Sequence, residues 1–161
     1  MTPTPTIPSD LLQEWIRAVE SNDADRITNL YRTDASVIGY ATSPSTIHVG
    51  PSAIYDLYYD IISIGKTKKI TLLSQNPHIF GTVAVNFGHY REQHEEGEDG
   101  FHRNDITAYF SFVYLEDDNG EWKIFSHHFS LVNFILNEFS VKELRQMLKE
   151  KEKENYSQDM R

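Results

Sequence analysis

The chain has 161 residues, 24 acidic side chains against 15 basic ones, and a formal net charge of −9. Hydrophobic residues make up 39% and aromatic residues 12%, a composition that predicts one globular domain rather than a disordered chain. The acidic surface repels phosphate backbones, so no nucleic-acid partner is expected. There is no cysteine, which excludes disulfides, thiolate metal sites and cysteine nucleophiles.

The first ten residues, MTPTPTIPSD, lack the basic and apolar regions of a signal peptide. No apolar run reaches the roughly 18 residues that a membrane span needs, so no membrane partner is expected. These features predict a cytoplasmic protein.

Residues 1–8 read as a flexible Pro/Thr arm. A helix then follows from Ser9 or Asp10, because its apolar residues recur at helical spacing: Leu11, Leu12, Trp15, Ile16 and Val19. Asp23 can cap a second, shorter helix that carries Ile27, Leu30 and Tyr31.

Residues 35–40 are predicted as a short strand and residues 45–50 as a loop. Gly50-Pro51 then opens a third helix, which ends near Gly65.

After Gly65 the apolar residues alternate, which predicts four strands over 68–74, 78–93, 104–116 and 121–135. Asn119-Gly120 is a strong turn signal between the last two. Helices followed by an antiparallel sheet indicate the α+β class. The domain is expected over 9–135, with 136–161 forming a charged C-terminal helix and tail.

Three stretches of the chain carry a resemblance to a known family. They are DADRITNLYRTDASVIG (23–39), NPHIFGTVAVNFGHYR (76–91) and WKIFSHHFS (122–130). In this order and spacing they resemble the nuclear transport factor 2-like superfamily, which includes SnoaL-like cyclases and ketosteroid isomerase. The second and third stretches are most similar to the calcium/calmodulin-dependent protein kinase II association-domain group.

The resemblance implies a cone-shaped fold in which three N-terminal helices pack on a curved antiparallel sheet, followed here by a C-terminal helix. It also implies a pocket between the helices and the sheet. Arg91 matches a pocket arginine of the association domains. Two further pocket arginines of that group are matched here by Tyr55 and Phe112.

The alternation along 83–91 places Val83, Val85, Phe87, His89 and Arg91 on one face, which we predict to face the core because it is the more apolar. Arg91 then has two interpretations. It can clamp an anionic ligand, or it can lie at the rim and pair with a carboxylate.

The same reasoning in 122–130 predicts that His128 and Ser130 point into the pocket. His128 is either an internally hydrogen-bonded imidazole or a general base. Tyr55, Trp15, Tyr31 and Phe112 complete the predicted ligand-binding set. The strand interiors are expected to carry no carboxylate, which leaves His128, His89 and Asp105 as candidate bases. No metal site and no cofactor are expected.

The second face of the last two strands is also apolar. Tyr109, Phe125, His127 and Phe129 are therefore predicted to bury this face in a homodimer. Three functions remain open. The leading hypothesis is a homodimer that binds a small anionic or amphipathic molecule; the alternatives are an isomerase, cyclase or dehydratase of the SnoaL-like type, and an oligomerisation module.

Overall fold

The computed structural model describes residues 8–39, 47–96 and 105–132. Three helices and six strands lie within these ranges. In chain order they are α1 (Pro8–Glu20), α2 (Ala24–Thr28), β1 (Tyr31–Gly39), β2 (Ile47–Val49), α3 (Pro51–Ile64), β3 (Thr67–Phe80), β4 (Val83–His94), β5 (Ile106–Glu116) and β6 (Trp122–Leu131).

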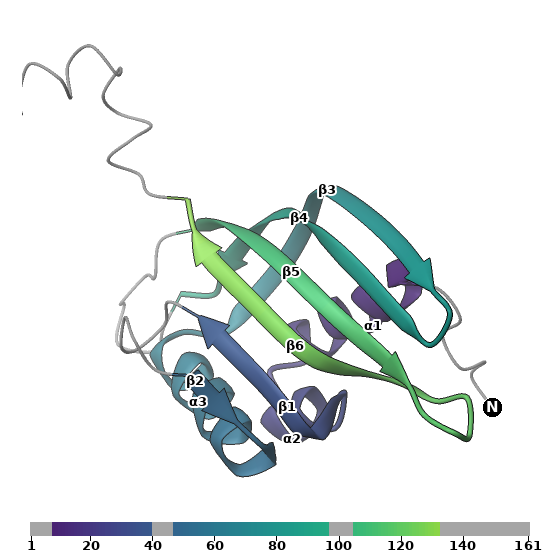
Figure 1. Ribbon diagram of the computed structural model, residues 1–161. Helices are drawn as coiled ribbons and strands as arrows, with labels where there is room; N and C mark the ends of the chain where they lie inside the picture. The colour runs from purple at the N-terminus through teal and green to yellow at the C-terminus, as the bar shows by residue number, and fades with distance from the viewer. Residues whose placement is uncertain (1–7, 40–46, 97–104, 133–161) are drawn as a thin grey trace, which may run out of the picture. The chain divides into compact units, whose positions relative to one another are not determined.

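The six strands form one curved sheet in the order β2-β1-β6-β5-β4-β3 (Figure 1). Every neighbouring pair is antiparallel except β1 and β6, which are parallel. The helices lie behind the sheet in Figure 1, with α1 against β3 and β4, and α3 against β1 and β2. We call the face toward the helices the inner face and the opposite face the outer face.

The core lies on the inner face and is built by size complementarity between strands. β5 contributes Phe110, Phe112 and Tyr114, all nearly fully buried. The directly opposite positions of β4 include Gly88, Asn86 and Ala84, respectively. Small side chains on one strand leave room for the large rings of the next, which close packing requires.

Asn22 joins the end of α1 to the start of β3. Its φ of 53° is left-handed, a conformation that asparagine tolerates. The side-chain amide donates to the Thr67 carbonyl at 2.9 Å and accepts from the Thr67 amide at 2.8 Å. These two bonds fix where Thr67 enters the sheet.

The α+β class is confirmed, but several boundaries differ from the prediction. Tyr31, predicted on the second helix, begins β1 instead, because α2 ends at Thr28 and the backbone of Tyr31 pairs with Ile124 of β6. Residues 47–49, expected as loop, pair with β1 as β2. Residues 78–80 belong to β3 rather than to the next strand, since the chain reverses at Gly81, whose φ of 61° suits a tight turn.

The predicted arm up to residue 7 and the predicted C-terminal helix from residue 136 lie outside the described residues. Within the described ranges, no helix is long and apolar enough to cross a membrane.

Candidate functional site

The faces of β4 are the reverse of those predicted. Asn86, Tyr90 and Glu92 are buried on the inner face, whereas Phe87 and Arg91 are exposed on the outer face. Arg91 pairs with Asp105 at 3.1 Å. The prediction failed because the outer face is itself apolar, so apolar content did not distinguish it from the core. Arg91 therefore does not line a pocket under the helices.

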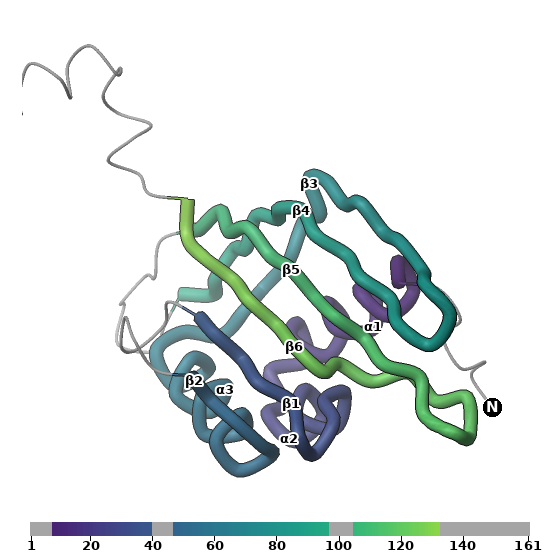
Figure 2. The backbone as a smooth tube through the Cα atoms, in the orientation of Figure 1, coloured from purple at the N-terminus to yellow at the C-terminus, as the bar shows by residue number. Residues whose placement is uncertain are grey.

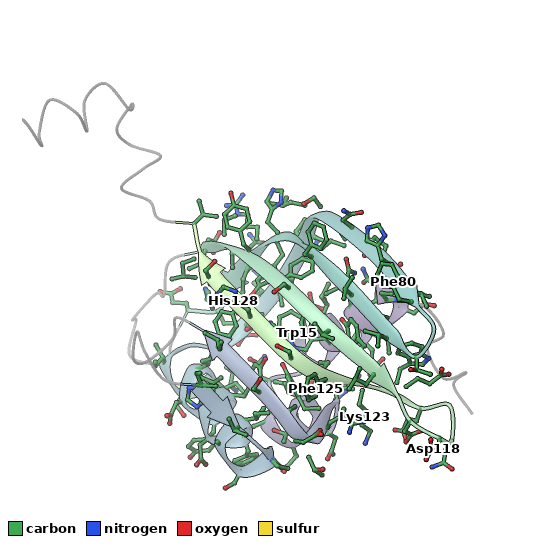
Figure 3. The ribbon with its side chains drawn as sticks, in the orientation of Figure 1. Trp15, Phe80, Asp118, Lys123, Phe125 and His128 are labelled. Atoms are coloured by element: carbon green, nitrogen blue, oxygen red, sulfur yellow. The ribbon has the colours of Figure 1, made fainter. Side chains whose placement is uncertain are left out.

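A β-bulge in β6 reverses which of the following side chains point to the inner face and which to the outer face. Val113 pairs with Ser126, but the next residue of β5, Tyr114, pairs with Ile124, so Phe125 has no opposite residue. After this extra residue the alternation inverts. His127, which was assigned to the interface, is 1% exposed on the inner face. His128, which was assigned to the pocket, is exposed on the outer face (Figure 3).

His127 belongs to a buried polar network that joins four elements. The Tyr31 hydroxyl lies 2.8 Å from His127 Nδ1 and 2.7 Å from the Tyr58 hydroxyl. Trp15 Nε1 donates to Tyr31 at 3.2 Å and to Tyr58 at 3.3 Å. Phe112 stacks on the His127 ring at 4.0 Å. α1, β1, α3 and β6 are thus tied together at one point.

Burial controls the protonation of this network. It lowers the pKa of His127 to about 3, with a smaller contribution from His128, so the imidazole is neutral at pH 7. Burial likewise raises the pKa of Tyr58 to about 12. Burial also raises the pKa of Tyr31 well above its usual range, so both hydroxyls are protonated at neutral pH and the network carries no charge.

The direction of the hydrogen bonds follows from His127 Nε2, which is buried and has no partner among the described residues. An unpaired buried N–H is rarer than an unpaired acceptor, so we assign the proton to Nδ1. His127 then donates to the Tyr31 oxygen, and Tyr31 donates to Tyr58. The Tyr58 O–H remains available as a donor.

Tyr58 lines a cavity between the helices and the inner face, which we call the central cavity. Its other walls include Trp15, Tyr90 and Phe129, with the Glu92 carboxylate and Thr67 on one side. Ile106 and Leu131 lie at the start of β5 and the end of β6, respectively, and also contribute to the wall. The free volume is about 40 Å³, roughly enough for two or three waters.

Glu92 is the charged group of this cavity and was missed by the sequence analysis, which expected no interior carboxylate. It is 7% exposed, accepts a hydrogen bond from Thr67 Oγ1 at 2.5 Å, and lies 3.2 Å from His94 Nε2. Its charge also raises the pKa of Tyr58, as one of the smaller contributions. The cavity therefore joins a carboxylate acceptor with an aromatic wall and a tyrosine donor.

The structure brings together only part of the predicted ligand-binding set. Trp15, Tyr31 and Phe112 are buried around His127. Tyr55 is half-buried on α3 and stacks on the exposed Tyr59. Ser130 pairs with the exposed Tyr109 on the outer face.

The candidate bases are also outside the central cavity. His128 is exposed, His89 lies 2.6 Å from Ser74 Oγ on the outer face, and Asp105 is paired with Arg91. No group of histidines and carboxylates suited to a metal ion occurs within the described ranges.

One sequence signal could have found Glu92 and Tyr90. Gly88 and Ala84 lie on the same face of β4 as Tyr90 and Glu92. Small residues on one strand leave room for large rings on the neighbouring strand, and β5 is rich in phenylalanine. Size complementarity between neighbouring strands, rather than apolar content alone, identifies that face as the inner one. The bulge at Phe125 has no such signal in the sequence.

A family model described as SnoaL-like domain matches residues 9–133. The chain belongs to this family. The match begins at the second residue of α1 and covers all the other helices and strands in full.

Solved structures of low sequence identity share the fold. A candidate calcium/calmodulin-dependent protein kinase II association domain from Xanthomonas campestris is 22% identical, with a TM-score of 0.64 over 81% of this chain and 95% of that one. A nuclear transport factor 2-like superfamily protein from Salmonella enterica is 19% identical, with a TM-score of 0.64 over 76% and 86% of the two chains.

A third similar structure is a ketosteroid isomerase-like protein from Erwinia carotovora. It is 12% identical, with a TM-score of 0.59 over 78% of this chain and 93% of that one. The resemblance to the nuclear transport factor 2-like superfamily, including the association-domain group, is therefore confirmed. Among proteins with curated descriptions, no sequence matches this chain.

Proposed function

We propose that the central cavity binds a small amphipathic molecule that donates a hydrogen bond to Glu92. The observation that carries this proposal is a carboxylate held among aromatic rings on the inner face. Binding sites of this kind combine apolar walls with a few fixed polar groups. A ligand larger than a few waters has to displace wall side chains such as Phe129, which is only half-buried.

The charge of the cavity favours a donor or a cation over an anion. The expectation of an anionic ligand rested on Arg91 in the pocket, and Glu92 occupies the inward position next to it. A carboxylate repels anions and accepts hydrogen bonds from alcohols and ammonium groups. Aromatic walls add attraction for a cation.

Titration calorimetry with benzylammonium, benzyl alcohol and benzoate tests this proposal with one ring and three polar groups. We expect the ammonium and the alcohol to bind and benzoate to bind at least tenfold more weakly. Glu92→Gln should remove most of this preference. Arg91→Gln is the matched control, since the neighbouring side chain points to the opposite face, and it should change nothing. Benzoate binding as tightly as benzylammonium would contradict the proposal.

A second candidate function is proton transfer, favoured by the presence of Glu92 and Tyr58 in one cavity. Glu92 would take a proton from the carbon next to a carbonyl group, and the electron pair would move onto the carbonyl oxygen. The Tyr58 O–H would stabilise that oxygen by hydrogen bonding. An isomerase-type or dehydratase-type reaction can begin with this step.

Hydrogen–deuterium exchange of cyclohexanone in D₂O, followed by NMR, tests for this step directly. An enzyme should accelerate exchange above the buffer rate, and Glu92→Gln should abolish the acceleration while Arg91→Gln retains it. Binding without acceleration would favour the ligand-binding function alone.

We also propose that the outer face of the sheet forms a homodimer. Several large apolar side chains are exposed there: Ile38, Phe80, Phe87, Tyr109 and Phe125. Figure 3 labels Phe80 and Phe125 among them. Arg91 and Asp105 form an ion pair near one end of this face. Apolar surface of this extent favours a partner. The previously predicted His127 and Phe129 are not part of it, because both lie on the inner side.

Native mass spectrometry tests the dimer. Phe87→Glu and Phe125→Glu should each produce monomers. Tyr59→Glu should not, because Tyr59 is more exposed than either but lies on α3, away from the outer face. If the wild-type protein is a monomer at micromolar concentration, the proposal is wrong. A dimer that survives both substitutions uses another surface.

A further inference from the structure

A second hollow lies at the opposite end of β5 and β6 from the central cavity. Its wall consists of Leu11 on α1, Leu30 before β1, and Trp122 and Ile124 on β6, with Tyr114 of β5 among them. Its volume is about 130 Å³, larger than the free space of the central cavity. We call it the Tyr114 hollow. An apolar cavity of about 150 Å³ is enough to hold a benzene ring.

Tyr114 is the unusual residue in the wall of this hollow, because its hydroxyl is buried behind that wall. The side chain is 1% exposed, and its hydroxyl has no hydrogen-bond partner among the described residues. Burial raises the pKa of this phenol well above its usual range, so it stays protonated and can donate. A buried donor without an acceptor is costly, and most tyrosines in such places have a partner.

The charged side chains at the Tyr114 hollow are already paired with groups of opposite charge, so the hollow does not require a charged ligand. Glu14 lies 2.8 Å from Arg17 and 3.4 Å from Arg26, and Lys123 lies 3.6 Å from Glu121. Each carboxylate thus already has a basic partner. The remaining requirement is one hydrogen-bond acceptor attached to an apolar body of ring size.

We propose that the Tyr114 hollow is a second ligand site, which takes a compact neutral ring compound bearing one hydrogen-bond acceptor for the Tyr114 hydroxyl. This site is independent of the function proposed for the central cavity. The two hollows use successive parts of α1, since Leu11 lines one and Trp15 lines the other.

The chain provides its own reporters, because its two tryptophans lie one in each hollow. Their assigned indole N–H signals in a proton–nitrogen NMR spectrum show which hollow a probe enters. Benzonitrile and toluene form a matched pair of probes, because they share a ring and only benzonitrile carries an acceptor. We expect benzonitrile to shift the Trp122 signal and not the Trp15 signal.

One net hydrogen bond corresponds to a preference of roughly twofold to tenfold, so benzonitrile should bind more tightly than toluene by that factor. Tyr114→Phe should keep the hollow and bind both probes equally. Tyr59→Phe removes an exposed hydroxyl from α3, away from both hollows and the sheet, and should leave the preference intact.

Any of four results would overturn the proposal, and the first three concern the pattern of binding. The first three are equal binding of the two probes by the wild-type protein, a preference that survives in Tyr114→Phe, and a shift confined to the Trp15 signal, which would place the probe in the central cavity. The absence of any shift at the solubility limit of benzonitrile would also overturn it.

Discussion

Tyr31 and His127 are separated by 96 positions in the sequence, and the Tyr31 hydroxyl lies 2.8 Å from His127 Nδ1. The contact joins the start of β1 to the second half of β6, two strands that pair in parallel. Because both side chains are buried, the protonation of His127 is linked to folding.

The first prediction concerns the pH dependence of stability. The pKa of His127 is lowered from 6.5 to about 3 in the folded protein, so the unfolded chain binds the proton more readily. The full contribution of the neutral imidazole is present above pH 6.5. It is lost as the pH falls from about 6.5 toward 3, at up to about 1.4 kcal/mol per pH unit.

Urea denaturation at a series of pH values measures this loss. His127→Gln should lower the free energy of unfolding at pH 7 and make its decline between pH 6.5 and 4 shallower. His128→Gln removes the exposed neighbouring histidine and should keep the wild-type slope. Identical slopes for all three proteins would mean that His127 is solvated in the folded state.

The second prediction concerns the Tyr31 hydroxyl, which contacts Trp15, Tyr58 and His127. Tyr31→Phe leaves buried polar groups without their partner, so it should lower the free energy of unfolding by about 1 to 3 kcal/mol. Tyr59→Phe, on the exposed side of α3, should change it by less than about 0.5 kcal/mol. A similar cost for both would show that the network contributes nothing.

Sequence patterns predicted the elements better than the direction of their side chains. The spacing of Leu11, Trp15 and Val19 marks one face of α1, and all three are buried there. Trp15 could be identified as an inner residue because a helix of this length has only one apolar face.

The strands are less predictable because each has two faces. On β4 the outer face carries apolar residues such as Phe87, whereas the inner face carries the charged Glu92. Apolar content therefore pointed to the wrong face. On β6 the single extra residue Phe125 moves His127 inward and His128 outward. The alternation of side chains along a strand does not show where a bulge interrupts it. The network around His127 could therefore be found only from the structure.

The third prediction concerns Asn22, whose amide nitrogen and oxygen both bond the backbone of Thr67. Asn22→Asp keeps the shape but replaces the donor facing the Thr67 carbonyl by an acceptor. We expect a loss of about 1 to 3 kcal/mol in the free energy of unfolding. Because Thr67 Oγ1 donates to Glu92, the affinity of the central cavity for benzylammonium should fall too.

Asn119→Asp controls for the added charge, since Asn119 lies exposed in the turn between β5 and β6. It should leave both stability and affinity unchanged. If Asn22→Asp also leaves stability and affinity unchanged, the position of Thr67 does not depend on Asn22.

The last prediction compares two glycines in the sheet. A Cβ added at Gly88 would overlap the backbone carbonyl of Ser74 on β3, and a Cβ at Gly39 would overlap the ring of Phe129 on β6. A carbonyl within a paired strand cannot move without disturbing the hydrogen bonds around it, whereas a ring can rotate. Gly88→Ala should therefore cost about 3 kcal/mol or more, and Gly39→Ala about 1 to 2 kcal/mol.

The two substitutions should also differ in their effect on ligand binding. Phe129 lines the central cavity and Ser74 does not line it. Gly39→Ala pushes the Phe129 ring away from its place and should change the affinity for benzylammonium severalfold, while the folded fraction of Gly88→Ala should bind as the wild type does. Calorimetry at a temperature where both variants are folded separates these effects. Equal affinities for Gly39→Ala and the wild type would show that the position of the Phe129 ring does not limit entry to the cavity.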